Sequence, residues 1–266
     1  MTAILEVSDL TVQYRRRPAP ALDNVSCTIA QGETVALVGE SGSGKSTLGN
    51  AILGLVPVAH GSITFEGTED ITRPTRYRRR TLTRHIQAIF QDPYGSLNPA
   101  RTIGKALAEP LRAHGITDDM ATRVTGALER VGLDAAAAGK YPAQFSGGQR
   151  QRIAIARALM LEPRLIICDE PLSALDLSVQ AQVLNLLKAL QRDLGVSYLF
   201  ITHDLAIVPH IAHRVVVLRG GQIVETGTVS EVCDHPSHPY TQRLIQAAPV
   251  PDPDLQRARR RALESQ

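Results

Sequence analysis

The feature that most constrains the fold of this chain is a glycine-rich loop, Gly-Glu-Ser-Gly-Ser-Gly-Lys-Ser, at residues 39–46. The uninterrupted apolar run Thr34–Val38 precedes it, and such runs are typical of strands buried on both faces of a parallel sheet. After the loop, Leu48, Ile52 and Leu55 share one face of a predicted helix. A strand, a glycine-rich loop and a helix in this order predict a phosphate-binding loop, the alternative being a turn without a ligand.

The residue types of the loop suit a polyphosphate, which needs many hydrogen-bond donors at close range. Gly39, Gly42 and Gly44 allow backbone N–H groups to turn inward, and the start of the following helix adds a favourable dipole. We therefore expect Lys45 to reach the outer phosphates and Ser46 to bind magnesium.

A second buried strand, Leu165–Glu170, ends in the adjacent carboxylates Asp169 and Glu170. A protein core does not accept two carboxylates without a purpose. We expect Asp169 to hold magnesium through water, and Glu170 to orient and polarise the water that attacks a terminal phosphate. The alternative is a solvated pair of acids at a strand end.

Polar residues also follow two further predicted strands. Gln91 follows the strand His85–Phe90, where its amide can meet a metal or a water, and His203 follows the strand Ser197–Thr202. Open α/β sheets bind ligands at the carboxyl ends of their strands, so a phosphate contact is expected for this histidine. A purely structural histidine is the alternative.

The remaining segments frame this arrangement. Apolar residues alternate at 5–14 and 25–29 and predict antiparallel β-structure, and glycines bound another short strand at 61–67. Residues 100–160 predict helices, and residues 214–225 predict a hairpin that turns at a Gly-Gly pair.

The helical stretch closes on Ser146, which is expected to cap the next helix. Ile153, Ala156 and Met160 share one face of that helix. Its exposed N-terminus predicts a second anion site.

The composition limits the setting of the chain. Its 266 residues can bury a core without metal or disulfide staples, and its net charge of +3 is weak evidence for nucleic acid. The three scattered cysteines argue for a reducing compartment. No apolar run approaches the roughly 20 residues of a membrane span, and the N-terminus lacks the layout of a secretion signal. We expect a cytoplasmic chain that can dock on a membrane protein.

Three features admit two interpretations each. Tyr14 either packs at a strand end or offers a flat face to adenine. The arginine-dense stretch 76–84 is either a solvated basic face or a contact for acidic lipids. Cys233, His235 and His238 are either metal ligands or part of a proline-rich turn.

Taken in order, these segments resemble the nucleotide-binding subunit of an ATP-binding cassette (ABC) transporter, over residues 4 to about 245. Phe145 departs from the family, which more often has leucine there. The similar motifs are the Walker A loop (39–47), the Q-loop (Gln91), the signature (146–149), the Walker B strand (165–170), the D-loop (173–176) and the switch histidine (His203).

The resemblance implies an α/β fold with a P-loop NTPase (RecA-like) core, an N-terminal antiparallel β subdomain and an inserted α-helical subdomain. The cassette is expected over residues 1–245, with its core at 1–91 and 160–230 and the helical subdomain at about 92–159. A C-terminal extension is expected over 231–266, ending in a polar, disordered tail from residue 249.

The resemblance also implies ATP and Mg²⁺ as cofactors. The implied catalytic residues are Glu170, His203, Gln91 and Lys45, and the implied metal ligands are Ser46, Gln91 and Asp169. The residues implied to bind nucleotide are Tyr14, Gly39, Glu40, Ser41, Gly42, Ser43, Gly44, Lys45, Ser46, Thr47, Ser146, Gly147, Gly148, Gln149 and Asp176. Among them, residues 146–149 are implied to contact the nucleotide held by a partner subunit.

Two stretches, at 90–99 and 235–241, resemble the dipeptide and oligopeptide importer branch, whose relatives also carry nickel. The second stretch also gives the two histidines near Cys233 a place in a family motif instead of a metal site. The implied function is an ATP-hydrolysing subunit that powers import of di- or oligopeptides across the cytoplasmic membrane. The alternatives are import of nickel or another small solute, or a soluble ABC ATPase that acts on nucleic acid or ribosomes.

The implied partners follow from that function. They are a second ATP-binding subunit, which is a paralogue or a second copy, two transmembrane permease subunits and an extracytoplasmic solute-binding protein. No nucleic acid is expected, and the expected location is the cytoplasmic face of the cell membrane.

Overall fold

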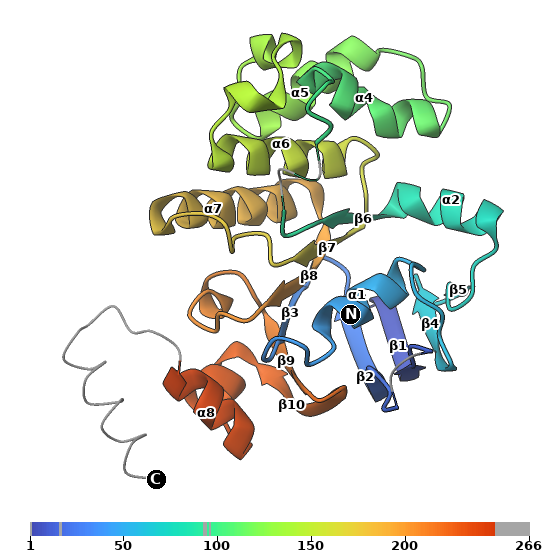
Figure 1. Ribbon diagram of the computed structural model, residues 1–266, viewed down its shortest axis with the longest axis vertical. Helices are drawn as coiled ribbons and strands as arrows, with labels where there is room; N and C mark the ends of the chain where they lie inside the picture. Colours follow the sequence, from blue (N-terminus) through green and yellow to red (C-terminus); the bar gives the residue numbers. More distant parts are fainter. Residues whose placement is uncertain (1, 16–17, 93–94, 96, 248–266) are drawn as a thin grey trace.

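The computed structural model describes residues 2–15, 18–92, 95 and 97–247. Two sheets and a group of helices are arranged along its longest axis (Figure 1). The predicted polar tail from residue 249 lies outside the described residues.

A six-stranded sheet forms the centre of the molecule, in the order β10-β9-β3-β8-β7-β6. Neighbouring strands from β9 to β6 run parallel, and only β10 pairs antiparallel. The carboxyl ends of β3, β6, β7 and β8 therefore lie at one edge of the sheet. The bounds are β3 Thr34–Val38, β6 Ile86–Ile89, β7 Leu165–Asp169, β8 Ser197–Thr202, β9 Arg214–Arg219 and β10 Gln222–Thr228.

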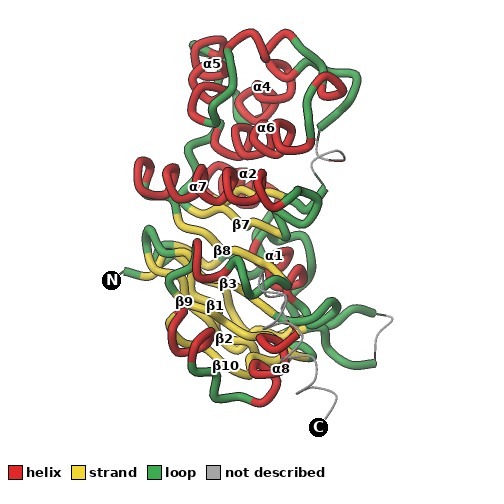
Figure 2. The backbone as a smooth tube through the Cα atoms, turned by 90° about the vertical axis from the view of Figure 1, so that its left-hand side faces the viewer, coloured by secondary structure: helices red, strands yellow, loops and turns green. Residues whose placement is uncertain are grey.

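Apolar residues on both faces of this sheet explain the unbroken apolar runs. Every residue of β3 and β8 is buried. Tyr198 and Phe200 pack into one core with the helices α6 (Gly147–Leu159) and α7 (Leu177–Leu194), and Leu199 and Ile201 pack into another with α1 (Lys45–Ile52) and the second sheet. Figure 2 shows the strands between these layers.

The second sheet has the order β2-β1-β4-β5 and is antiparallel throughout, as the N-terminal pattern predicts. The register shifts between Val7 and Leu10, where Asp9 has a φ of 50°. This bulge explains why the apolar alternation changes phase there. The bounds are β1 Ala3–Val12, β2 Leu22–Ala30, β4 His60–Phe65 and β5 Glu69–Asp70.

Helices occupy the chain between β6 and β7, which confirms the helical prediction for residues 100–160. The helices α4 (Ile103–Ala113) and α5 (Met120–Arg130) pack on α6, and together they form one end of the molecule (Figure 1). The 3₁₀ turns at Ala135–Gly139 and Pro142–Gln144 connect α5 to α6.

Two sequence predictions need correction. Leu55 is 56% exposed because α1 ends at Ile52, where Gly54 adopts a φ of 65° and the Leu55 N–H donates to the Asn50 carbonyl. This glycine termination is the common way to end a helix. The strand predicted over residues 85–90 is shorter, since His85 ends the helix α2 (Arg76–His85) that precedes β6.

Beyond the 3₁₀ turn Val208–His210 and the hairpin β9–β10, the chain forms a short π-helix, Ser230–Asp234, and the helix α8 (Pro239–Ala247). Tyr240 of α8 and Val232 are buried with β3 and β9 residues in a third apolar cluster. None of the helices in the described part of the chain combines the length and apolar composition needed to cross a bilayer.

Candidate functional site

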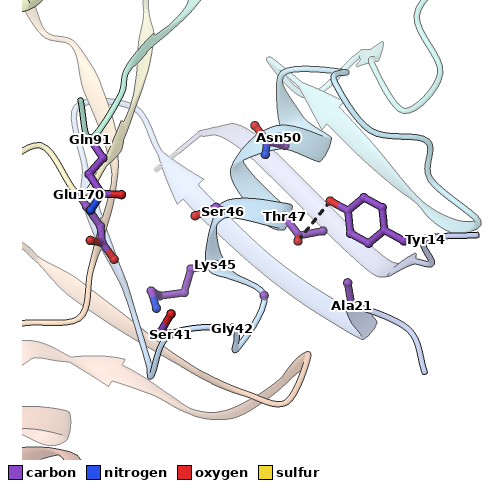
Figure 3. A pocket seen from close by; sticks show the side chains of 11 residues that line it. Tyr14, Ala21, Ser41, Gly42, Lys45, Ser46, Thr47, Asn50, Gln91 and Glu170 are labelled. Atoms are coloured by element: carbon purple, nitrogen blue, oxygen red, sulfur yellow. Dashed lines mark hydrogen bonds between the residues drawn. The ribbon is translucent and has the colours of Figure 1, made fainter. Parts of the chain in front are cut away.

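A cleft of about 610 Å³ opens where β3 passes through the glycine-rich loop into α1. A volume of this size is in the usual range of small-molecule sites. Figure 3 shows side chains from four separate parts of the chain around it. The lining residues are Tyr14, Ala21, Ser41, Gly42, Gly44, Lys45, Ser46, Thr47, Asn50, Gln91 and Glu170.

The backbone of the loop requires glycine at two positions. Gly44 has a φ of 111°, and Gly39, with a φ of 152°, lies so close to Leu218 that a Cβ atom would overlap the Leu218 carbonyl oxygen. The loop is also bonded to the β9–β10 turn, because the Gly221 N–H donates to the Ser43 carbonyl at 2.9 Å. The loop therefore rests on this hairpin and presents its open side to the cleft.

Lys45 lies at the base of the loop. Its Nζ donates to the carbonyl oxygens of Gly39, at 2.7 Å, and Glu40, at 2.8 Å, and the residue is only 5% exposed. Burial lowers the pKa of Lys45, against the opposing effect of the carboxylates of Glu170, Asp169 and Glu40. Two backbone carbonyl groups thus hold the Lys45 amine at the cleft wall. A bound anion can take their place as the hydrogen-bond acceptor.

Ser46 and Asp169 bring two oxygen ligands together from α1 and the end of β7. The Ser46 hydroxyl donates to Asp169 Oδ1 at 3.1 Å. Burial raises the pKa of Asp169, and the Ser46 hydrogen bond opposes this effect. Burial makes the charged form of the Asp169 carboxylate unfavourable, and a bound divalent cation would offset that cost. Hard divalent cations prefer oxygen ligands, so the Ser46 hydroxyl and this carboxylate fit such an ion.

Glu170 and His203 form a pair at the carboxyl ends of β7 and β8. His203 Nδ1 lies 3.1 Å from Glu170 Oε1, and since a carboxylate only accepts, the ring nitrogen is the donor. Glu170 has a φ of 47°, and its N–H donates to the Ile201 carbonyl at 3.0 Å. This backbone turns the carboxylate away from the strand and into the cleft wall beside Gln91 (Figure 3).

Comparison with known protein families shows to which family this chain belongs. A family model described as "ABC transporter" matches residues 22–173, which is more than half of the 266 residues. The chain belongs to the ABC transporter family. A second family model, "Oligopeptide/dipeptide transporter, C-terminal region", matches residues 224–266.

Individual relatives agree with this membership. The glutathione import ATP-binding protein GsiA of Salmonella choleraesuis is 53% identical over 246 residues, which is 92% of this chain but 39% of the relative. The chain therefore spans less than half the length of the curated relatives it matches.

Solved structures of ABC proteins share the fold. One is cbiO1 of Clostridium perfringens, part of the ABC transporter complex cbiONQ, with 31% identity, a TM-score of 0.78 and coverage of 88% of this chain and 92% of that one. Another is a dimeric post-hydrolysis state of the ATP-binding cassette MJ0796 bound to ADP and Pi, with 29% identity, a TM-score of 0.75 and coverage of 85% and 98%. These likenesses confirm the predicted α/β fold of an ATP-binding cassette.

The segment that resembles the ABC signature lies away from the cleft. Ser146 Oγ accepts from the Gln149 N–H at 3.3 Å, and Gln149 Oε1 accepts from the Ser146 N–H at 3.0 Å, which makes a capping box at the start of α6. Within the described residues, none of Ser146 to Gln149 lines the cleft of its own chain. Gly148 packs so tightly on α7 that a Cβ atom would overlap Val179.

The D-loop residue Asp176 also lies outside the cleft lining. Its Oδ1 accepts from the Val179 N–H at 3.0 Å and from the Ser178 hydroxyl at 2.7 Å, and these bonds lower the pKa of Asp176. The structure therefore gives Asp176 a structural role as the N-cap of α7. Its contact with nucleotide stays a prediction.

Tyr14 lies on the cleft wall opposite Glu170, and its hydroxyl is 3.5 Å from Thr47 Oγ1 (Figure 3). Two lining residues were not predicted. Asn50 lies one helical turn after Ser46, a spacing that places both side chains on one face of α1 and could have indicated it. Ala21 comes from the chain before β2, and no local pattern indicates it.

The structure shows the surroundings of two features that the sequence left with two interpretations, the stretch 76–84 and the histidines near Cys233. Arg76 to Thr81 of α2 are all exposed, and only Leu82 of this helix is buried. In the described part of the chain, no group of three or more His, Cys, Asp or Glu is placed to hold a metal ion. His238 instead accepts the Tyr240 N–H on its Nδ1 at 3.1 Å, within the turn that starts α8.

Proposed function

We propose that this chain is the ATP-hydrolysing subunit of an importer, and that its cargo is a di- or oligopeptide. One observation carries the ATPase part: Lys45, Ser46 and Glu170 line one cleft at the edge of the sheet, and Asp169 and His203 are hydrogen-bonded to two of them. A glycine-rich loop with a lysine and a hydroxyl that can reach Mg²⁺ is the arrangement that binds nucleotide phosphates.

The residues act on the nucleotide as follows. Tyr14 stacks on adenine, and the loop N–H groups with Lys45 bind the phosphates. Ser46, Asp169 and Gln91 hold Mg²⁺, which neutralises charge on the phosphate oxygens.

Glu170 accepts a proton from the attacking water, and His203 keeps that carboxylate oriented and contacts the terminal phosphate. The left-handed backbone at Glu170 fixes the direction of its side chain. These roles require the pair to stay at the cleft edge when ATP is present.

A second ATP-binding subunit completes each site, with residues 146–149 facing the phosphates bound by the partner. The capping box supports this arrangement because it orders the start of α6 while Ser146 and Gln149 stay exposed to solvent. The similar solved structure of the cassette MJ0796, a dimer bound to ADP and Pi, supports it as well. The proposed partner is a paralogue or a second copy.

The permease is proposed to dock in a groove that lies beside Gln91. The groove has a volume of about 450 Å³, and α2, β6 and α6 all line it. Leu55 and Phe90, two of the large exposed apolar residues, lie in it. Two permease subunits and an extracytoplasmic solute-binding protein would place the chain on the cytoplasmic face of the membrane.

The peptide cargo rests on two supports. The C-terminal family match is to oligopeptide and dipeptide transporters, and the relative at 53% identity is named for import of glutathione, a tripeptide. A glutathione-like or longer peptide is therefore the proposed solute. Nickel or another small solute is the competing outcome of the uptake test.

Lys45→Ala tests the ATPase part. The variant is expected to lose ATP affinity by at least tenfold, because a charge-assisted contact to phosphate contributes about 1.5–3 kcal/mol. Lys105→Ala, on the exposed surface of α4, is the matched control and should bind ATP as the unchanged chain does. Equal ATP binding by both variants would contradict the proposed cleft.

The cargo needs a separate experiment. Vesicles that contain this subunit, its permease partners and its solute-binding protein should accumulate labelled glutathione or dipeptides only with ATP. If they hydrolyse ATP and accumulate nickel or another solute but no peptide, the peptide assignment is wrong and the ATPase assignment stands.

A further inference from the structure

The C-terminal stretch at residues 235–241 has no role in the proposed hydrolysis, yet it reaches the phosphate-binding loop. The Glu40 N–H donates to the Tyr240 hydroxyl at 3.0 Å, across 200 residues of sequence. Tyr240 is 3% exposed, and a buried tyrosine hydroxyl requires a partner. The loop backbone is that partner.

The surrounding residues hold the Tyr240 ring in place. Tyr240 belongs to a buried apolar cluster with Val38, Val217 and Val232, and the Arg219 guanidinium lies over its ring at 5.0 Å from the ring centre. A cation over an aromatic face is attractive. Burial and this contact hold the Tyr240 side chain in the position that places its hydroxyl oxygen beside the Glu40 N–H.

The backbone of the stretch is fixed as well. Glu225 of β10 accepts from the Ser237 N–H and hydroxyl, both at 2.7 Å, and from the His238 N–H at 3.2 Å. His238 Nδ1 then accepts from the Tyr240 N–H at 3.1 Å, and Pro239 starts α8. These hydrogen bonds connect the hairpin β9–β10 to Tyr240 and restrict the backbone between them.

Glu40 is not part of the cleft lining, so Tyr240 contacts the loop from behind. The same rear side receives the Gly221 N–H at the Ser43 carbonyl, and Gly39 packs on Leu218. The Glu40 N–H is thereby committed to Tyr240, and the Glu40 carbonyl accepts from Lys45 Nζ at 2.8 Å and from the Ser43 N–H at 3.2 Å, so the bond from Tyr240 holds a residue that also anchors Lys45 and the loop. Binding that uses preorganised donors avoids the cost of ordering them.

We infer that Tyr240 is a positioning residue for the phosphate-binding loop, and that the C-terminal segment sets the nucleotide affinity of the cleft through this hydrogen bond. The statement about affinity rests on the proposed function, whereas the statement about loop order does not.

Tyr240→Phe in the full chain tests the inference, because it removes the hydroxyl and keeps the ring beneath Arg219. Without nucleotide, the peptide that contains residues 39–44 should exchange its amide hydrogens faster than in the unchanged chain. The Kd for ATP should rise about two- to tenfold, the usual effect of one hydrogen bond, and kcat at saturating ATP should change less than twofold.

Tyr198→Phe is the matched control. Tyr198 is also buried, and its hydroxyl donates to the Leu187 carbonyl at 3.1 Å, away from the cleft lining. This variant should unfold at a lower temperature with unchanged exchange in the loop peptide and an unchanged Kd for ATP.

Unchanged loop exchange in Tyr240→Phe would overturn the inference, and so would an equal change in Tyr198→Phe. If the unchanged chain fails to bind ATP, the proposed function fails, and the exchange comparison still decides whether Tyr240 orders the loop.

Discussion

Glu170 combines a side chain 20% exposed, a histidine partner at 3.1 Å and a left-handed backbone. None of these features is needed for packing, because the buried apolar part of β7 ends at Cys168, two residues before Glu170. A left-handed backbone conformation is strained in a residue other than glycine, and strain of this kind is typical of functional sites.

Glu170→Gln should abolish ATP hydrolysis and preserve ATP binding. The amide keeps the size of the side chain but accepts no proton from water, so kcat should fall about 100- to 10,000-fold. Phosphate release measures kcat, and equilibrium titration measures the Kd for ATP.

Glu109→Gln provides the control for Glu170→Gln, because Glu109 pairs with Arg101 on the surface of α4 at 3.2 Å. It should leave both constants unchanged. Steady-state turnover that persists in Glu170→Gln would remove Glu170 from its proposed role.

Asp169→Asn should stabilise the chain at neutral pH when nucleotide and Mg²⁺ are absent. Burial raises the pKa of Asp169, so the folded state binds a proton more tightly than the unfolded state. The free energy of unfolding then decreases as pH rises through and above the ordinary aspartate range, and the asparagine variant escapes this decrease. Urea unfolding should show a stability gain at pH 7 that disappears below about pH 3.5. A gain that stays constant with pH would contradict the assignment to ionisation.

The sequence indicates site residues wherever a local pattern surrounds them. Lys45 and Ser46 follow from the glycine-rich loop, and Glu170 follows from two acids at the end of an apolar run. Ala21 and the contact between Glu40 and Tyr240 do not follow, because they depend on which distant segments the fold brings together. The roles of the site residues stay predictions until the variants are measured.

Among the elements, the junction of α6 and α7 leaves no room for an added methyl group at Gly148. A Cβ atom on Gly148 would overlap Val179, whose branched side chain cannot turn aside. Gly148→Ala should therefore lower the free energy of unfolding by about 1–3 kcal/mol, the usual cost of overpacking.

The second substitution Val179→Ala should restore most of the stability lost in Gly148→Ala, because it removes the overlapping methyl group. Chemical denaturation of both single variants and the double variant gives the coupling energy. Strictly additive effects would show that the two side chains do not compete for the same space.

Buried strands were the most predictable elements. The ranges Thr34–Val38 and Ser197–Thr202 coincide with β3 and β8, because burial on both faces leaves no polar interruption that blurs the ends. Helix ends were less predictable: Leu55 continues the apolar spacing of α1, but Gly54 stops the helix first. The helix α8 was not predicted because it is short and its apolar side consists of only Tyr240, Leu244 and Ile245.

For the whole molecule, the proposal requires two chains around each nucleotide. If the partner is a second copy, Glu170→Gln with ATP should therefore sediment as a dimer and without ATP as a monomer; if it is a paralogue, the dimer should form only when that paralogue is added. Adding Gly147→Asp should keep the chain monomeric with ATP, because a carboxylate at the start of α6 repels phosphate.

The second substitution in that test should not disturb folding, since a Cβ atom on Gly147 meets nothing closer than Leu175 Cδ2 at 3.7 Å. ATP hydrolysis per chain should also rise with protein concentration. A monomer that hydrolyses ATP at full speed at every concentration would contradict the shared site.

The bond between Glu40 and Tyr240 has a further consequence during synthesis. The glycine-rich loop leaves the ribosome 200 residues before the side chain that fastens it. Until α8 has docked, the nascent chain should hold ATP about two- to tenfold more weakly than the finished fold, as expected for Tyr240→Phe. Full affinity for ATP then arises only after translation has passed Tyr240.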